Sequence, residues 1–279
     1  MPFVDLPSGI RICHETFGDP ADPTVLLLHG LGSQMLVWDE AFCCLLADEG
    51  FRVVRSDHRD SGLSTILDEG APPYSLSDMA ADAVGLLDAL DLADVHVVGF
   101  SLGGMVAQTI AVEHPGRCRS LVSMGSATGS RDVGRPAPET SAAMLAEPPP
   151  DAEGALSKDL SNLRLWASDW HDEDHAQAKY QAYRRRSVQP RHAYVRQWGA
   201  AQAAGNREAA LTTIRVPTRV IHGTRDTLIL PSAGERTAEV IPGADLVLIE
   251  GWGHDVSPGG FEILVSTIVD HCHAVEATR

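Results

Sequence analysis

A serine flanked by two glycines is the first candidate for chemistry. The stretch VVGFSLGGMVAQ, residues 97–108, places Ser101 between Gly99 and Gly103, after β-branched residues and before a helix-forming run. This G-x-S-x-G pattern, between a strand and a helix, is typical of a turn so sharp that the serine hydroxyl projects freely. The unpaired N–H groups at the start of the helix would point toward that oxygen. The pattern therefore predicts a nucleophilic serine.

A serine hydroxyl is a weak nucleophile at neutral pH, so it needs a base that a carboxylate orients. RVIHGTRD, residues 219–226, puts Asp226 on the loop after one predicted strand, and LVLIEGWGHD, residues 246–255, puts His254 on the loop after the next. Open α/β sheets place such loops together at the carboxyl edge. We therefore expect Ser101, Asp226 and His254, in this chain order, to form a catalytic triad.

Acyl transfer also needs donors for the developing oxyanion. The main-chain N–H of Leu102, directly after the serine, is the first candidate. The second is the N–H of Leu31 in HGLGS, residues 29–33, where two glycines allow the main chain to approach a ligand. Because both donors belong to the main chain, the side chains at these positions are free to vary.

Other acidic and histidine residues compete for these roles. Asp255 is a second candidate acid, but it adjoins His254 and would have to curl back onto that ring, so we favour Asp226. HDEDH, from His171 to His175, lacks the glutamate that H-E-x-x-H requires after the first histidine. We interpret it as a charged, solvent-facing helix start, and we expect neither a metal site nor a cofactor.

Four further histidines have expected structural roles. His29 and His222 end predicted strands near the site. Since other residues already fill the acid–base roles, we expect them to support the structure around the site. His271 and His273 lie near the end of the chain, and we expect them to fray into solvent.

Composition limits the classes of partner. The chain has 279 residues, with 38 acidic and 22 basic residues and a formal net charge of −16. A field of this sign repels phosphate backbones and anionic membrane surfaces, so we expect a small-molecule substrate rather than nucleic acid or membrane. No signal peptide or apolar span is recognisable, and the five cysteines lack metal-like spacing. We expect a cytoplasmic protein with reduced thiols, and the sequence does not indicate an oligomeric state.

Short apolar runs alternate with helical patterns along most of the chain, which predicts βαβ units, an α/β class and a mostly parallel sheet. The predicted strands are 24–29, 52–57, 94–100, 120–125, 216–223 and 244–251. The predicted helices are 38–49, 77–90, 102–114, 231–240 and 260–273.

The alternation stops between residues 131 and 190, where two proline-rich stretches and helical segments occur without a strand. We interpret residues 131–205 as a helical cap inserted into a core made of residues 1–130 and 206–279; an ordinary surface excursion is the alternative. Aromatic side chains concentrate in this segment. Those that could line a substrate pocket, or simply pack the cap, are Trp166, Trp170, Tyr183 and Trp198.

These motifs together resemble the α/β-hydrolase fold family over nearly the whole chain outside residues 131–190. The resemblance rests on HGLG, the serine turn, the G-x-x-D that ends at Asp226, the G-x-G-H that ends at His254, and DHRDSGLS at 57–64. The last motif usually reads D-x-R-G-x-G-x-S in this family, and here Asp60 replaces the first glycine. With FGDPADPTVLLLHG, this variant resembles the branch of polyketide methyl-esterases such as aclacinomycin methylesterase.

The resemblance implies a mostly parallel central sheet flanked by helices, with a helical cap after the sixth strand. It implies that Ser101 attacks an acyl carbon, that His254 takes the proton and later activates water, and that Asp226 holds the imidazole. The amides of Leu31 and Leu102 would bind the oxyanion. A serine nucleophile differs from the aspartate expected in the haloalkane dehalogenase and epoxide hydrolase branches.

The sequence therefore predicts a serine esterase that cleaves a small to medium, partly apolar carboxylic ester without a cofactor. The same triad also suits a haloperoxidase-like perhydrolase or a C–C bond hydrolase, which product analysis would separate. A third alternative is a ligand-binding receptor that keeps the triad but scarcely turns over. Labelling of Ser101 without multiple turnovers would favour that receptor.

Overall fold

One eight-stranded sheet forms the centre of the molecule, with the strand order β1-β2-β4-β3-β5-β6-β7-β8. The computed structural model describes residues 1–147, 149 and 151–279. Strands β3 to β8 run parallel, whereas β1 and β2 pair antiparallel with each other and β2 pairs antiparallel with β4. The strands are Phe3–Asp5 (β1), Arg11–Phe17 (β2), Thr24–Leu28 (β3), Arg52–Ser56 (β4), Val95–Phe100 (β5), Cys118–Met124 (β6), Thr218–Gly223 (β7) and Asp245–Ile249 (β8).

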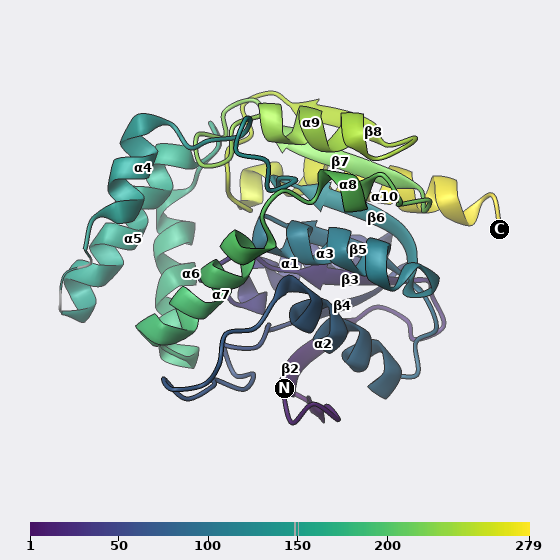
Figure 1. The fold of residues 1–279 in the computed structure, drawn as a ribbon, viewed down its shortest axis with the longest axis horizontal. Coiled ribbons are helices and arrows are strands. Elements are labelled where there is room, and N and C mark those ends of the chain that lie inside the picture. Colours follow the sequence, from purple (N-terminus) through teal and green to yellow (C-terminus); the bar gives the residue numbers. More distant parts are fainter. Residues whose placement is uncertain (148, 150) are drawn as a thin grey trace.

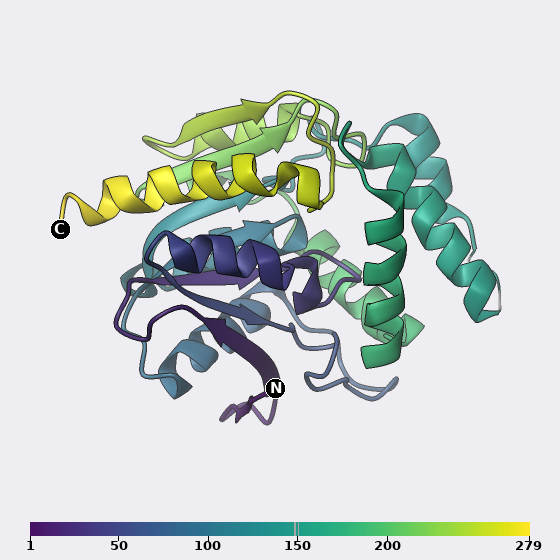
Figure 2. The ribbon, with the colours of Figure 1, turned by 180° about the vertical axis from the view of Figure 1, so that it is seen from behind.

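Helices cover both faces of the sheet (Figures 1 and 2). One face carries α2 (Leu76–Ala89), α3 (Leu102–Glu113), α8 (Glu208–Leu211) and α9 (Ser232–Val240), and the other carries α1 (Glu40–Asp48) and α10 (Phe261–Glu276). Three short 3₁₀ helices are Met35–Val37 (η1), Pro115–Arg117 (η2) and Pro258–Gly260 (η3). In the described part of the chain, no helix has the length and apolar character that crossing a membrane requires.

The core consists of two apolar layers, one on each side of the sheet. Successive strand residues point to opposite faces, so Val97 packs in the layer with Val106 of α3, and Val98 packs in the layer with Leu264 of α10. A strand buried on both faces is apolar at most of its positions. This explains why β3 and β5 appear in the sequence as mostly apolar runs, with the buried His96 as an exception in β5.

The predicted α/β class and mostly parallel sheet are confirmed, and the predicted elements agree with the observed bounds to within about three residues. Strands β1 and β2 were not predicted, because RICHETF at 11–17 mixes polar and apolar residues as an outer strand does. The expected fraying of the C-terminal histidines into solvent is wrong for His271, whereas His273 is exposed but lies within the ordered α10 helix. His271 is buried within α10, and His273 stacks on Phe51 at a centroid distance of 4.9 Å.

Of the five described helices between β6 and β7, all except α8 gather beyond one end of the sheet, at the left of Figure 1. They are α4 (Pro138–Leu145), α5 (Ala152–Trp166), α6 (Glu173–Arg186) and α7 (Arg191–Ala204). We refer to these four helices and their connections as the cap helices. They follow the sixth strand, and no described residue between α4 and β7 belongs to a strand.

Two buried ion pairs join the cap helices to the loop after β4. Arg186 at the end of α6 lies 2.6 Å from Asp57, and Arg196 of α7 lies 2.8 Å from Asp60, with all four side chains at most 8% exposed. Asp60 has a φ of 62°, a left-handed conformation that favours glycine. The aspartate that departs from the family's D-x-R-G pattern therefore provides the carboxylate that binds α7.

We expect Asp60→Gly to destabilise the protein even though glycine suits this backbone conformation. Removing one partner of a buried ion pair costs about 3–5 kcal/mol, and relief of the left-handed backbone returns roughly 1–2 kcal/mol. The net expectation is a free energy of unfolding lowered by roughly 2 kcal/mol, measured by urea denaturation. Asp5→Ala, which removes the exposed pair with Arg11, is the control and should have little effect. An unchanged or increased stability of Asp60→Gly would contradict this role.

Candidate active site

Ser101 occupies the turn between β5 and α3 in a strained backbone conformation. Its φ is 56° and its ψ is −119°, in a region that costs a non-glycine residue roughly 1–3 kcal/mol. The Ser101 N–H donates to the Met124 carbonyl at the end of β6, at 2.9 Å. The turn therefore holds the serine where the carboxyl ends of β5 and β6 meet.

The glycines around Ser101 allow neighbouring main-chain segments to approach so closely that no side chain would fit between them. A Cβ atom on Gly99 would overlap the Gly103 carbonyl, and one on Gly103 would overlap the Leu28 carbonyl of β3. A Cβ atom on Gly104 would lie 2.6 Å from the Cβ of Ser126. These three positions, on both sides of the strained turn at Ser101, therefore require glycine for packing.

Asp226 and His254 meet across the loops that follow β7 and β8. His254 Nδ1 lies 2.6 Å from Asp226 Oδ2, so the ring donates its Nδ1–H to the carboxylate. The other carboxylate oxygen accepts the main-chain N–H groups of Leu228 and Ile229, at 2.9 and 2.8 Å. Both side chains are buried. This arrangement fixes the ring and leaves Nε2 as the basic nitrogen.

His222 is a second neighbour of the Asp226 carboxylate, and sequence reasoning gave it only an unspecified structural role. Its Nε2 lies 3.5 Å from Asp226 Oδ2 and 2.8 Å from the Ile229 carbonyl. Burial raises the pKa of Asp226, but the charge of His254 and the hydrogen bonds from His222 and His254 outweigh burial and lower it to about 2. The carboxylate is therefore ionised across the neutral range.

His254 packs against the same strand ends that carry Ser101. The Phe100 and His254 ring centroids are 4.7 Å apart. A Cβ atom on Gly125, the residue after β6, would lie 3.4 Å from His254 Nδ1. The structure thus brings the histidine to the ends of β5 and β6, while the orienting carboxylate comes from β7.

The proposed oxyanion donors belong to segments beside Ser101. A Cβ atom on Gly30 would lie 3.2 Å from the Ser101 Cβ, which places the Leu31 segment next to the serine. Leu102 is the first residue of α3. Within the described residues, neither the Leu31 N–H nor the Leu102 N–H has a protein acceptor. Both groups are therefore free to donate to a bound oxygen.

His29 fixes the segment that precedes Leu31. Its Nε2 accepts the His58 N–H at 3.1 Å, and its Nδ1 lies 2.8 Å from the Gly30 carbonyl. Burial lowers the pKa of His29 to about 4, which keeps the ring neutral. The expected structural role of this histidine is thus to join the loop after β3 to the loop after β4.

The model of the alpha/beta hydrolase fold family matches residues 23–260. The chain belongs to the α/β-hydrolase fold family. It is 30% identical to the rhodomycin D methylesterase DauP of a Streptomyces species, over 95% of this chain and 96% of that protein. It is 31% identical to the 2-hydroxymuconate semialdehyde hydrolase of Pseudomonas putida, over 82% of this chain and 79% of that protein. The structure of the meta-cleavage product hydrolase CumD of Pseudomonas fluorescens superposes with a TM-score of 0.81 at 22% identity, covering 98% of both chains.

The aromatic candidates of this α/β-hydrolase lie in different environments. The Tyr183 hydroxyl of α6 is 3.4 Å from Ser33 Oγ, on the loop that holds Leu31. Trp166 ends α5 and packs against an apolar cluster that includes Leu163 of α5 and Ala176 of α6. The Trp170 ring lies over the glycines of η3, and Trp198 is 44% exposed. Tyr183 therefore contacts the proposed oxyanion loop, whereas Trp170 packs on the hydrolase core and Trp198 faces solvent.

The interpretation of His171–His175 as a solvent-facing helix start is wrong in part. His175 Nε2 lies 3.2 Å from Asp39, and His171 Nδ1 lies 3.9 Å from Asp255 Oδ2. Both rings are largely covered, at 27% and 15% exposure. They point to carboxylates of the core because α6 packs its first turn on the hydrolase domain, a contact that the local sequence does not encode.

We expect Gly103→Ala to destabilise the hydrolase, because its methyl group would overlap the Leu28 carbonyl. Overpacking against main-chain atoms predicts a free energy of unfolding lowered by at least about 2 kcal/mol, measured by chemical denaturation. Gly116→Ala is the matched control, since a Cβ atom there meets nothing within 4 Å. Equal stabilities of the two variants would show that Gly103 is not constrained by packing.

We expect the stability of the wild-type protein to depend more steeply on pH than that of Asp226→Asn at low pH. The pKa of Asp226 is lowered from 3.8 to about 2 by folding. Its ionised form therefore stabilises the fold above about pH 4, and this contribution is lost as the pH falls towards 2. Urea denaturation of both proteins between these limits measures the difference. A difference that stays constant with pH would refute the lowered pKa.

Proposed function

We propose that this α/β-hydrolase cleaves carboxylic esters through an acyl-enzyme on Ser101. The observation that carries the proposal is the buried 2.6 Å hydrogen bond between His254 Nδ1 and Asp226, set beside the strained turn of Ser101. This bond fixes the tautomer in which Nε2 can take a proton. The hydrogen bond does not involve Asp255, whose carboxylate binds Ser168 instead.

In the proposed acylation, His254 Nε2 takes the proton of Ser101 as Oγ attacks the ester carbonyl carbon. The carbonyl oxygen becomes an oxyanion that accepts hydrogen bonds from the N–H groups of Leu31 and Leu102. Asp226 stabilises the imidazolium that forms. His254 then gives the proton to the alcohol oxygen, the C–O bond breaks, and the acyl group stays on the serine.

In the proposed deacylation, His254 removes a proton from water, which attacks the acyl carbon. The same two N–H groups stabilise the second oxyanion, and the Ser101 oxygen leaves with the proton that His254 returns. The acid is released and the free serine is restored. His254 Nε2 carries each proton in turn, so these reaction steps need no further acid or base.

We propose methyl or other small-alcohol esters of partly apolar acids as the substrate class. The support is the rhodomycin D methylesterase DauP, which aligns with almost the full length of this chain. We assign residues 131–205 as the cap that selects the acyl group. Tyr183 is the proposed contact between that cap and the oxyanion loop, because its hydroxyl reaches the loop through Ser33.

C–C bond hydrolysis is the second candidate function. It is supported by the 31% identity to the 2-hydroxymuconate semialdehyde hydrolase, over 82% of this chain. The two activities share the serine, histidine and aspartate but differ in the leaving group, which is an alcohol in one case and a carbon acid in the other. Product analysis with a methyl ester and with a meta-cleavage diketone, at equal concentrations, separates them.

We expect Ser101→Ala to lower kcat for p-nitrophenyl esters by at least about 10⁴-fold, because removal of a triad nucleophile leaves only binding and oxyanion stabilisation. The wild-type protein should also be labelled by a fluorophosphonate at Ser101, as located by peptide mass spectrometry. Ser266→Ala, which removes a hydroxyl on the exposed side of α10, is the matched control. Residual activity of Ser101→Ala close to that of the control would exclude the proposal.

A further inference from the structure

The connection between α5 and α6 is bonded to both loops that carry the proposed acid and base. The Trp166 carbonyl at the end of α5 accepts the main-chain N–H of His254, at 2.5 Å. The Ala167 carbonyl accepts from Nε of Arg225, the residue before Asp226, at 2.8 Å. A turn of the cap therefore contacts the main chain of one loop and a side chain of the other.

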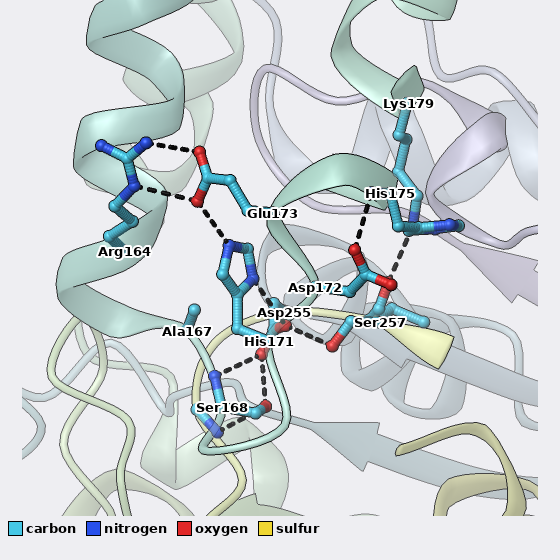
Figure 3. Close-up of polar contacts among 12 residues, drawn as sticks. Arg164, Ala167, Ser168, His171, Asp172, Glu173, His175, Lys179, Asp255 and Ser257 are labelled. Carbon is cyan, nitrogen blue, oxygen red and sulfur yellow. Dashed lines mark hydrogen bonds and ion pairs between the residues drawn. The ribbon is translucent and has the colours of Figure 1, made fainter. Parts of the chain in front are cut away.

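Ser168 extends this contact to the residues on either side of His254. Its hydroxyl accepts the Gly253 N–H at 3.0 Å and donates to Asp255 Oδ1. The Ser168 N–H donates to the same carboxylate oxygen at 2.9 Å. Figure 3 shows the serine and the carboxylate facing each other. Three consecutive residues, of which the histidine is the middle one, are thus hydrogen-bonded to one cap turn.

The fit between the two main chains depends on a glycine. A Cβ atom on Gly253 would overlap the Trp166 and Ala167 carbonyl groups. The glycine before His254 therefore permits the cap turn to reach the histidine loop. Because this distance is set by main-chain contact, a shift of the turn would shift the histidine with it.

The Asp255 carboxylate is buried at 7% exposure, and its hydrogen bonds hold it in one position. Besides the two groups of Ser168, it accepts the Ser257 hydroxyl at 2.6 Å. Two basic side chains face this region. His171 Nδ1 lies 3.9 Å from Asp255 Oδ2, and Lys179 binds Asp39 and the Val256 carbonyl of the histidine loop. A buried carboxylate with several donors resists displacement, since moving it would leave those donors unpaired.

We propose that Ser168 and Asp255 are positioning residues, which hold the His254 main chain so that the imidazole faces Ser101. This proposal rests on the proposed function, in which His254 is the base. Neither side chain touches the reacting atoms, and both act through the loop that carries the histidine. A misplacement of about 1 Å in a catalytic group can lower a rate about 10²-fold. The cap therefore positions the proposed base in addition to covering the core.

Four variants test this role. We expect Ser168→Ala and Asp255→Ala to lower kcat per labelled serine about 10- to 100-fold, with little change in KM, and to shift the acidic limb of the pH profile of kcat/KM. Asp255→Asn keeps an oxygen for Ser168 and should retain most activity. Ser266→Ala removes an exposed hydroxyl of α10 that bonds only to the Ile263 carbonyl of the same helix, and it is the matched control.

The rate of fluorophosphonate labelling and the low-field proton NMR signal of the His254 Nδ1–H separate the two proposals. An unlabelled, inactive wild-type protein would refute the esterase proposal. Loss or displacement of the NMR signal in Ser168→Ala, but not in Ser266→Ala, would still support the positioning role. A folded Ser168→Ala protein with the wild-type signal, labelling rate and pH profile would overturn that role. Lower thermal stability without these changes would overturn it as well, since it would show a purely structural contact.

Discussion

The buried hydrogen bond between His254 and Asp226 is the interaction on which the site depends. It joins loops from two different strands, and a carboxylate buried this deeply needs donors on both oxygens. The main-chain N–H groups of Leu228 and Ile229 supply donors to one oxygen, while His254 and the more distant His222 face the other. Much of the surrounding architecture serves to keep these groups at hydrogen-bonding distance. Close main-chain packing at glycines makes the arrangement stiff, because a shift in one loop would produce overlap in the next.

The cap helices are part of this arrangement rather than a separate cover. Two arginines of the cap enter the loop after β4 and pair with Asp57 and Asp60, and the turn after α5 bonds to the histidine loop. Asp57 also accepts the N–H of Met35, downstream of the proposed oxyanion segment. The cap is thus attached to the segments around the proposed nucleophile and base. A change in the cap helices that moves the turn after α5 would therefore also shift the loop that carries His254.

Sequence patterns predicted the fold well where the signal was local. Apolar runs located the buried parallel strands, and glycine spacing located the sharp turn at Ser101. The antiparallel strands β1 and β2 escaped prediction because a partly exposed outer strand has a mixed composition. His271 was misplaced because the apolar stripe of α10 continues past it to Val275, which buries the ring. In each case the sequence did not reveal which neighbouring segment packs against the strand or helix.

The sequence by itself determined the candidate reactive groups: a serine on a glycine-lined turn, and an acid and a histidine that each follow a strand. Parallel strands bring their carboxyl ends to one edge, so residues in such positions converge whatever their separation along the chain. The sequence also favoured Asp226 over Asp255 as the partner of the histidine, and only the tertiary structure decided what holds the histidine loop. Asp255 binds Ser168, and Asp60 binds Arg196, across 87 and 136 residues. No periodicity or motif in the sequence indicates such pairs, because a polar contact between distant segments forms only when packing brings those segments together.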